Sequence, residues 1–290
     1  MRNKLTEEKI TEIRTFYKSK PMSLSYLAET FGFCIPTIRK ALGENIEIYP
    51  KNRIFNPDLD EYFFETIDNE FKAYFLGLII ADGNVYDPND TSHGTNHKGS
   101  KWVSITLQDC DSYMLGIFRD KTRLTSNIAS DGRGSSYIAV RSTIMADSLG
   151  KYGIFQRKSF DTIYPPGIRD DLHRHVIRGI IDGDGSIDAY FKYTSHDNRN
   201  RFKHKISCCG THRLMEDMIN IITSHVKLNL IPHVYDYKNR ILSEFRISNV
   251  EDMFNLGKWM YKDSHVFLNR KYESFVKFME NYNLSMDKTI

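Results

Sequence analysis

Two aspartates, Asp82 and Asp184, each end an apolar segment and are each followed by glycine. Residues 77–85 read Gly-Leu-Ile-Ile-Ala-Asp-Gly-Asn-Val, and residues 179–187 read Gly-Ile-Ile-Asp-Gly-Asp-Gly-Ser-Ile. The two segments share Gly, Ile, Asp and Gly at matching positions, and their acids lie 102 positions apart (184 − 82 = 102). One Asp-Gly is typical of a turn. Two of them in matching apolar contexts indicate carboxylates that share a chemical task.

The residues before each acid are apolar nearly all round, which predicts two buried helices. Small residues recur four positions apart, as Ala73, Gly77 and Ala81 in the first helix and as Gly179 and Gly183 in the second. Residues four apart share a helix face. Glycine in a helix costs roughly 1 kcal/mol relative to alanine. Its repeated use on one face predicts that the two helices pack closely through Gly77 and Gly179.

Such packing brings Asp82 and Asp184 together at the C-terminal ends of the two helices. The helix dipole disfavours acids there, and two adjacent carboxylates also repel each other. A divalent cation relieves both conflicts. Because carboxylates and free backbone carbonyls are hard oxygen donors, the sequence predicts a shared Mg²⁺ site with two or more ions.

The segments that follow the two motifs correspond in order. Each half is predicted as helix, two strands, helix, two strands, helix, in an α+β fold with two pseudo-symmetric αββαββα halves at residues 70–168 and 169–290. The pattern predicts strands at 102–107, 136–141, 186–193, 202–209, 231–237 and 241–247, and helices at 111–123, 143–152, 211–226 and 250–261.

Residues 1–45 predict a small all-α unit that resembles a helix-turn-helix. Thr6 can cap the first helix, and Gly32 suits a sharp turn before the last one. The exposed side of the last helix offers Thr37, Arg39 and Lys40 to a major groove. A three-helix packing module without a ligand is the alternative. Residues 46–69, which lack periodicity, are predicted to be a linker.

Both motifs resemble the one that names the LAGLIDADG homing endonucleases, in their single-chain form with two motifs. The resemblance covers about residues 70–280. It implies that Asp82 and Asp184 bind the catalytic metal ions and that the carbonyls of Ala81 and Gly183 complete the coordination. The earlier acid of the family motif is present in the second copy, as the residue before Gly183, but is isoleucine in the first.

The resemblance also implies further active-site residues. A basic residue of each half is expected near the scissile phosphates, and we assign this role to Lys158 and Lys262, which follow the two aspartates by similar intervals. A surface lysine without a task is the alternative in each case. Gln108 lies where the family often orients a water molecule, and its counterpart in the second half is Gly210.

The four strands of each half are expected to form a saddle over DNA, with outward side chains in the major groove. Six Lys and Arg against one acid between residues 192 and 213 support a basic surface. Sequence does not separate base contacts from phosphate contacts. The candidate DNA-binding residues are Lys101, Arg133, Arg141, Tyr190, Lys192, Arg201, Lys203, Lys205, Lys238, Arg240 and Arg246.

The implied function is site-specific, metal-dependent hydrolysis of double-stranded DNA with a staggered cut, as in intron homing. The implied partner is a duplex with a long, non-palindromic target, bound by a monomer. Two alternatives stay open. One is a non-cleaving transcription regulator with a LAGLIDADG-like domain, which the two retained acids disfavour. The other is an intron RNA-splicing maturase, which the helix-turn-helix pattern disfavours.

Composition adds bounds to this interpretation. The 290 residues are 40% hydrophobic and 27% charged, typical of a globular protein, and the net charge of +3 is too small to indicate nucleic-acid binding alone. The four cysteines lack metal-ligand spacing and are interpreted as small hydrophobes. Without a membrane-length apolar run or a secretory signal pattern, we expect a cytoplasmic, nucleoid-associated protein.

Overall fold

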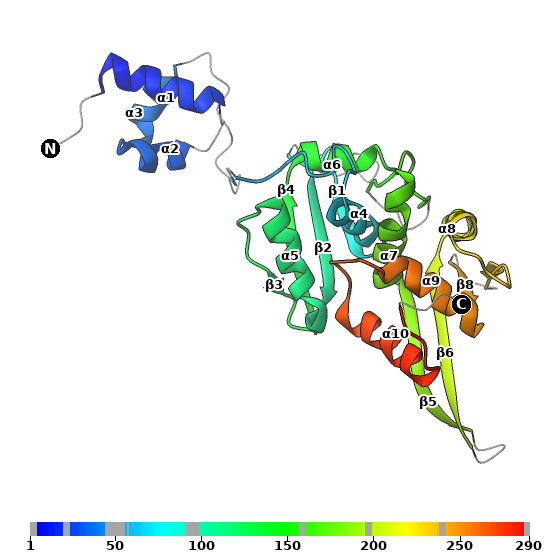
Figure 1. The fold of residues 1–290 in the computed structure, drawn as a ribbon. Coiled ribbons are helices and arrows are strands. Elements are labelled where there is room, and N and C mark those ends of the chain that lie inside the picture. The colour runs from blue at the N-terminus through cyan, green and yellow to red at the C-terminus, as the bar shows by residue number, and fades with distance from the viewer. Residues whose placement is uncertain are drawn as a thin grey trace. The chain divides into compact units, whose positions relative to one another are not determined.

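The chain forms two compact units, Met1–Leu59 and Asp60–Ile290, drawn as ribbons in Figure 1. The computed structural model describes residues 5–19, 24–43, 56, 58–90, 99–156, 161–194, 199–237 and 242–286. None of the helices in these ranges is long and apolar enough to cross a membrane.

The N-terminal unit contains three short helices. The amide of Lys9 donates to the Thr6 hydroxyl at 3.3 Å, which caps the first helix as its sequence predicts. Gly32 has a φ of +66°, a conformation that glycine adopts without steric cost, and it turns the chain between the second and third helices. Ile13, Leu27 and Ile38 are fully buried in the core of the unit. The helices are α1 (Glu7–Ser19), α2 (Leu24–Phe31) and α3 (Ile35–Leu42).

The second unit contains two halves with the same order of elements, which confirms the predicted αββαββα repeat. The first half comprises α4 (Glu70–Asp82), β1 (Gly83–Tyr86), β2 (Trp102–Gln108), α5 (Tyr113–Thr122), β3 (Ala129–Ser130), β4 (Ser135–Arg141) and α6 (Thr143–Gly150). The second comprises α7 (His173–Asp184), β5 (Gly185–Thr194), β6 (Arg199–Gly210), α8 (His212–His225), β7 (Tyr235–Asp236), β8 (Ser243–Ile247) and α9 (Val250–Tyr261).

Each half forms a four-stranded antiparallel sheet, with strand orders β1-β2-β4-β3 and β5-β6-β8-β7. Burial alternates along the strands. In β2, Val103, Ile105 and Leu107 are buried against the helices, whereas Thr106 and Gln108 are exposed on the opposite face. This alternation is typical of a sheet with one face on a core and one in solvent. The outward face of each sheet is therefore available to a partner.

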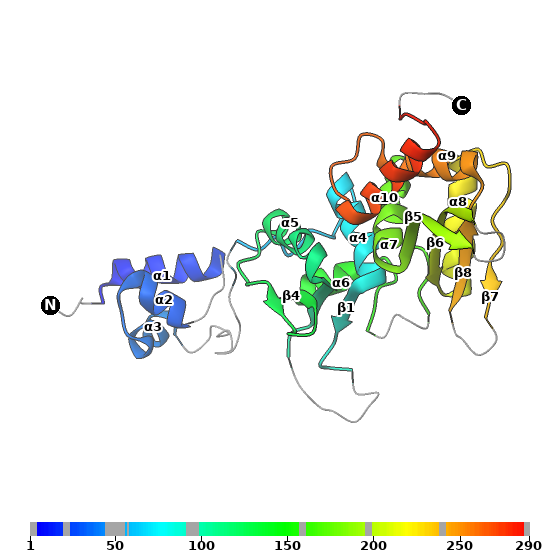
Figure 2. The same cartoon turned by 90° about the horizontal axis from the view of Figure 1, so that it is seen from below.

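The helices α4 and α7 lie side by side at the centre of the unit, as Figures 1 and 2 both show. A Cβ atom on Gly77 would lie 2.1 Å from the backbone oxygen of Val176, and one on Gly179 would lie 2.2 Å from that of Tyr74. Because real Cβ contacts of this length do not occur, only glycine allows the two backbones to approach this closely.

The structure also departs from the predicted elements. A helix that we did not predict, α10 (Asn269–Asn281), follows α9 and packs against β5. The strand expected at 231–237 is shorter, since only Tyr235–Asp236 pairs with β8. The β5–β6 hairpin is longer than predicted and extends beyond the other strands of its sheet (Figure 1).

Candidate active site

The two motif aspartates are the last residues of the paired helices. A Cβ atom on Gly183 would lie 2.2 Å from the Ala81 Cβ and 2.9 Å from Oδ2 of Asp82. The Asp82 carboxylate therefore lies against the residue that precedes Asp184. Asp184 is exposed and Asp82 is partly exposed, so solvent and a substrate can reach both. Asp184 also borders a cavity of about 150 Å³, which Ala81, Gly210 and other residues line.

The donors at this position fit a hard divalent cation. Within the described ranges, no group of three or more His, Cys, Asp or Glu side chains forms a complete metal site. Two carboxylates and the carbonyls of a helix end are nevertheless the protein donors that Mg²⁺ uses when water and substrate phosphates supply its remaining ligands. The candidate donors are Asp82, Asp184 and the backbone oxygens of Ala81 and Gly183.

A second acid of the second motif, Asp182, is fully buried beneath this site. Its Oδ2 accepts hydrogen bonds from the Tyr74 hydroxyl and from the Leu268 amide, both at 2.8 Å. Burial raises the pKa of Asp182, although the ammonium of Lys271 opposes that shift. At the equivalent position of α4, Ile80 is buried as well. Asp182 therefore ties α7 to α4 and to the start of α10, and contributes no carboxylate to the exposed site.

Lys271 is a buried residue that sequence analysis missed. Its Nζ donates to the backbone oxygens of Ile181 at 2.6 Å and Gly185 at 2.8 Å, and also to that of Asp182. Burial lowers the pKa of Lys271, and the Asp182 carboxylate opposes that shift. Its position in the apolar stripe of α10, together with Phe275 and other buried residues, is the sequence feature that could have identified it.

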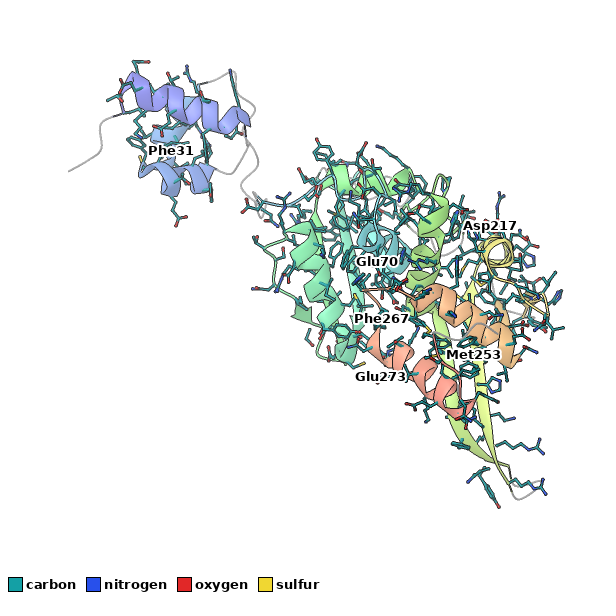
Figure 3. All side chains as sticks on the ribbon, in the orientation of Figure 1. Phe31, Glu70, Asp217, Met253, Phe267 and Glu273 are labelled. Carbon is teal, nitrogen blue, oxygen red and sulfur yellow. The ribbon has the colours of Figure 1, made fainter. Side chains whose placement is uncertain are left out.

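The opposite end of the helix pair is closed by an ionic cluster. The Glu70 carboxylate accepts from Arg178 Nη2 at 2.8 Å and from the His265 amide at 2.7 Å. Burial raises the pKa of Glu70, but these hydrogen bonds and the Arg178 charge outweigh it and hold the pKa below its usual value. Burial, reinforced by Arg178, lowers the pKa of His175 to about 3. Figure 3 labels Glu70 in the interior of the unit.

This cluster locates Lys262 far from the aspartates. The backbone oxygen of Lys262 accepts a hydrogen bond of 3.0 Å from Arg174. Arg174 precedes Asp184 by ten positions, which corresponds to roughly 15 Å along a helix. The segment that contains Lys262 also donates to Glu70, the first residue of α4. The predicted role of Lys262 at the scissile phosphates is therefore wrong. Lys158 lies outside the described residues.

The outward face of the first sheet carries an aromatic row. Tyr86, Trp102 and Arg141 are cross-strand neighbours, with ring centroids of the two aromatics 5.0 Å apart and the Arg141 guanidinium 5.3 Å from the Trp102 ring. Gln108 is exposed at the end of β2, and Arg133 is exposed in the β3–β4 turn.

Lys101 is not part of this outward face. Its ammonium lies 3.0 Å from Asp87 and 2.8 Å from Asp147 of α6. Hydrogen bonds from the ammonium to Asp147 and Asp87 raise the pKa of Lys101. Lys101 shares its strand parity with the buried Val103, which places it on the helix side of the sheet. The predicted DNA contact of Lys101 is therefore wrong.

The outward face of the second sheet is basic along the β5–β6 hairpin. Tyr190 pairs with Lys203 and Lys192 pairs with Arg201 across the strands, and all four side chains are exposed. Lys205 and Arg246 lie on the same face but each has an acid close by. The Lys205 ammonium is 3.6 Å from Asp188, and Arg246 bonds Glu244 at 2.6 Å. Lys238 and Arg240 lie outside the described residues.

The predicted helix-turn-helix residues lie on the surface of the N-terminal unit. Arg39 and Lys40 are exposed on α3, and Thr37 is half-buried, with its hydroxyl 3.0 Å from the Cys34 sulfur. Ile38, between Thr37 and Arg39, is fully buried. The same helix thus packs one side into the core of the unit and presents a basic side to solvent.

The sequence matches no protein-family model and no curated protein. Its fold matches the meganuclease I-SmaMI bound to uncleaveable DNA with a TTGT central four, at 12% identity and a TM-score of 0.53, over 74% of this chain and 93% of that one. I-SmaMI bound to an uncleaved DNA target in the presence of calcium ions matches at 14% identity and a TM-score of 0.51, over 75% and 93% of the two chains. The LAGLIDADG meganuclease I-AabMI bound to uncleaved DNA matches at 11% identity and a TM-score of 0.51, over 74% and 92%. The chain thus has the single-chain, two-motif LAGLIDADG fold.

Proposed function

We propose that this protein is a site-specific endonuclease of the homing type that hydrolyses both strands of a DNA duplex in a metal-dependent reaction. The observation that carries the proposal is the contact between the Asp82 carboxylate and Gly183, next to Asp184, at adjoining helix ends. Structures of the same fold are described as meganucleases bound to DNA. A regulator or a maturase does not need two solvent-accessible carboxylates at one position.

Asp82 and Asp184, together with the carbonyls of Ala81 and Gly183, are the residues that would hold the metal ions. A bound divalent cation supplies a nucleophilic water at neutral pH and stabilises charge on the leaving oxygen. The two carboxylates fix the position of the site relative to both sheets, because each is the last residue of a helix that leads directly into the first strand of its half. Each carboxylate serves one DNA strand, which gives a staggered cut.

The outward faces of the two sheets bind the duplex. On the second sheet, Tyr190, Lys192, Arg201 and Lys203 form the main basic contact surface, and Arg133 and Arg141 contribute from the first. Lys205 and Arg246 contribute less, because neighbouring carboxylates offset their charge. The sheets and the helix ends belong to one chain, so a monomer is sufficient to read a long, non-palindromic target.

The N-terminal unit adds DNA contacts through Thr37, Arg39 and Lys40 of α3. Deletion of residues 1–45 is expected to weaken binding while the remaining chain still cleaves at high protein concentration, because linkage acts through effective concentration. The logarithmic salt dependence of binding should fall by about 0.9 for each phosphate that the shortened chain no longer binds. Unchanged affinity and salt dependence would show that this unit packs against protein or has another partner.

The proposed nuclease activity is tested with duplex DNA from the region that flanks the gene, incubated with full-length protein with and without Mg²⁺. Double-strand cleavage at one position, with overhangs revealed by end mapping, is expected only with the metal. Binding without cleavage at saturating Mg²⁺ and Mn²⁺ would favour the transcription regulator. Selective binding of folded intron RNA over duplex DNA would favour the maturase.

A further inference from the structure

We propose that Lys271 is a positioning residue that holds the last turn of α7, and through it Asp184 and the Gly183 carbonyl, in the geometry of the cation site. This inference rests on the proposed function. Lys271 is distinct from the lysines that sequence spacing suggested, and it comes from α10, a helix outside the repeated αββαββα order.

The contacts of Lys271 lie on both sides of the motif acid. The backbone oxygens of Ile181 and Asp182 precede Gly183–Asp184, and the backbone oxygen of Gly185 follows it. One ammonium group therefore joins the last helical turn to the first residue of β5. An ammonium has three donors, and these three carbonyls match them in number. Lys271 leaves the carbonyl of Gly183, a candidate metal donor, outside this set.

Asp184 needs such support more than Asp82 does. Glycine on both sides, at 183 and 185, gives the backbone around Asp184 wide conformational freedom, whereas Asp82 follows an alanine. Helix ends also fray, because their last carbonyls lack partners within the helix. A positive charge at a helix C-terminus is favourable, which adds to the three hydrogen bonds.

The start of α10 is fixed in return by α7. Leu268 is the residue before α10, and its amide donates to the Asp182 carboxylate at 2.8 Å. The side chain of Asp182 thus caps the beginning of α10, while Lys271 in the first turn of α10 caps the end of α7. Both groups are buried, with Lys271 only 4% exposed. This reciprocal cap gives Lys271 a fixed position from which to orient the turn that carries Asp184.

In the first half, the chain takes a different course after α6. Between α6 and α7, the described residues 151–156 and 161–172 contain a 3₁₀ turn at Asp170–Leu172 and no helix comparable to α10. The cap provided by Lys271 is therefore an addition to the second half. Its loss is expected to affect the strand served by Asp184 more than the strand served by Asp82.

The test compares Lys271→Met with Lys277→Met, a change of an exposed lysine on the same helix. Full-length proteins are measured for cleavage under single-turnover conditions at saturating protein and Mg²⁺, for DNA affinity in Ca²⁺, and for amide hydrogen exchange. Loss of a residue that orients a metal ligand typically lowers activity about 10–100-fold. We expect that loss for Lys271→Met, with unchanged DNA affinity, accumulation of nicked product and faster exchange around residues 181–187. Lys277→Met should match the wild type.

Two further variants separate positioning from general stability. Glu70→Gln weakens the ionic cluster at the other end of α7, so it should lower the melting temperature without lowering the single-turnover rate. Lys271→Arg keeps the charge and several donors, and should restore part of the rate. If Lys271→Met does not fold, Lys271→Gln, which keeps two N–H donors on a shorter side chain, is measured in its place with the same expectation.

A wild-type cleavage rate in the Met or Gln variant, or equal rate losses in Glu70→Gln and the Lys271 variant, would overturn the proposal while leaving the nuclease function intact. If the wild-type protein cleaved no DNA, the proposed function would fail. Hydrogen exchange would still decide in that case. Faster exchange confined to residues 181–187 supports the cap, and unchanged exchange there refutes it.

Discussion

At one end of the α4–α7 helix pair, Glu70 meets the guanidinium of Arg178 and the backbone of residues 265–266, and its charge is neutralised inside the protein. At the other end, Asp82 and Asp184 stand at solvent-accessible helix C-termini, where the helix dipoles oppose them. Both ends belong to the same two helices. The closed end maintains the packing of the halves, and the open end keeps charge for a ligand from outside the chain.

The largest expected effect comes from removing charge at the open end. Asp82→Asn or Asp184→Asn should lower double-strand cleavage by more than about a hundredfold, since even the loss of an outer-shell partner costs about 10–100-fold. DNA binding and the melting temperature should persist, because one of two repelling carboxylates has been removed. Asp263→Asn, near the closed end, is the matched control. Near wild-type cutting by either motif variant would refute the shared site.

A change in the middle of the pair should affect stability instead. Gly77→Ala or Gly179→Ala places a methyl group about 2 Å from a backbone oxygen of the other helix, and overpacking of this kind costs about 1–3 kcal/mol or more. Gly116→Ala on α5 is the control, because a Cβ there meets nothing within 4 Å and should add up to about 1 kcal/mol. Equal denaturation midpoints for all three variants would mean that the helices can separate without cost.

The outward faces of the sheets allow a further comparison. Replacing Lys192, Arg201 and Lys203 by alanine should weaken DNA binding and reduce the logarithmic salt slope by about 0.9 for each phosphate that these side chains bind. Lys101→Ala should leave both quantities unchanged, because Lys101 is paired with Asp87 and Asp147 on the helix side. Fluorescence anisotropy across a salt series measures both. An equal effect of Lys101→Ala would show that net charge, and not position on the sheet, determines binding.

The smallest effect concerns acid sensitivity of the closed end. Buried His175 has a pKa of about 3 in the folded chain against 6.5 when unfolded, so the unfolded state binds more protons as the pH falls below 6.5. Stability should therefore decrease between pH 6.5 and 4.5. Further acidification removes the contribution of Glu70, whose pKa is depressed below 4.5. His175→Gln should reduce the fall in melting temperature over the first interval. The same slope in wild type and variant would argue against this assignment.

Much of the fold follows from periodic patterns along the sequence. The repeat identified α4, α7 and their terminal acids, because identical residues recur in identical local contexts. The order of helices and strands in each half followed from alternation of period two and from helical spacing. The parity of a strand also reveals its faces, and Lys101 would have been assigned to the core side if it had been grouped with Val103 and Ile105.

The positions of the lysines could not be predicted in the same way. Lys262 was chosen by its interval from Asp184, but an interval along the chain does not give a direction in space. The segment after α9 returns to the start of α7, where Arg174 and Glu70 bind it, and only then runs to the far end, where Lys271 lies. A buried lysine inside an apolar stripe is recognised only when its acceptors are known, and here they are backbone carbonyls.

The contact between Glu70 and His265 joins residues 195 positions apart. Synthesis of that much chain takes roughly 10–40 s at the usual rates of translation. During this interval α4 has emerged from the ribosome with an apolar surface that α7 and the 265–266 segment have yet to cover. The first half is therefore expected to depend on chaperones or on transient self-association until the second half follows. The order of synthesis thereby sets a period of exposure that the finished structure no longer reveals.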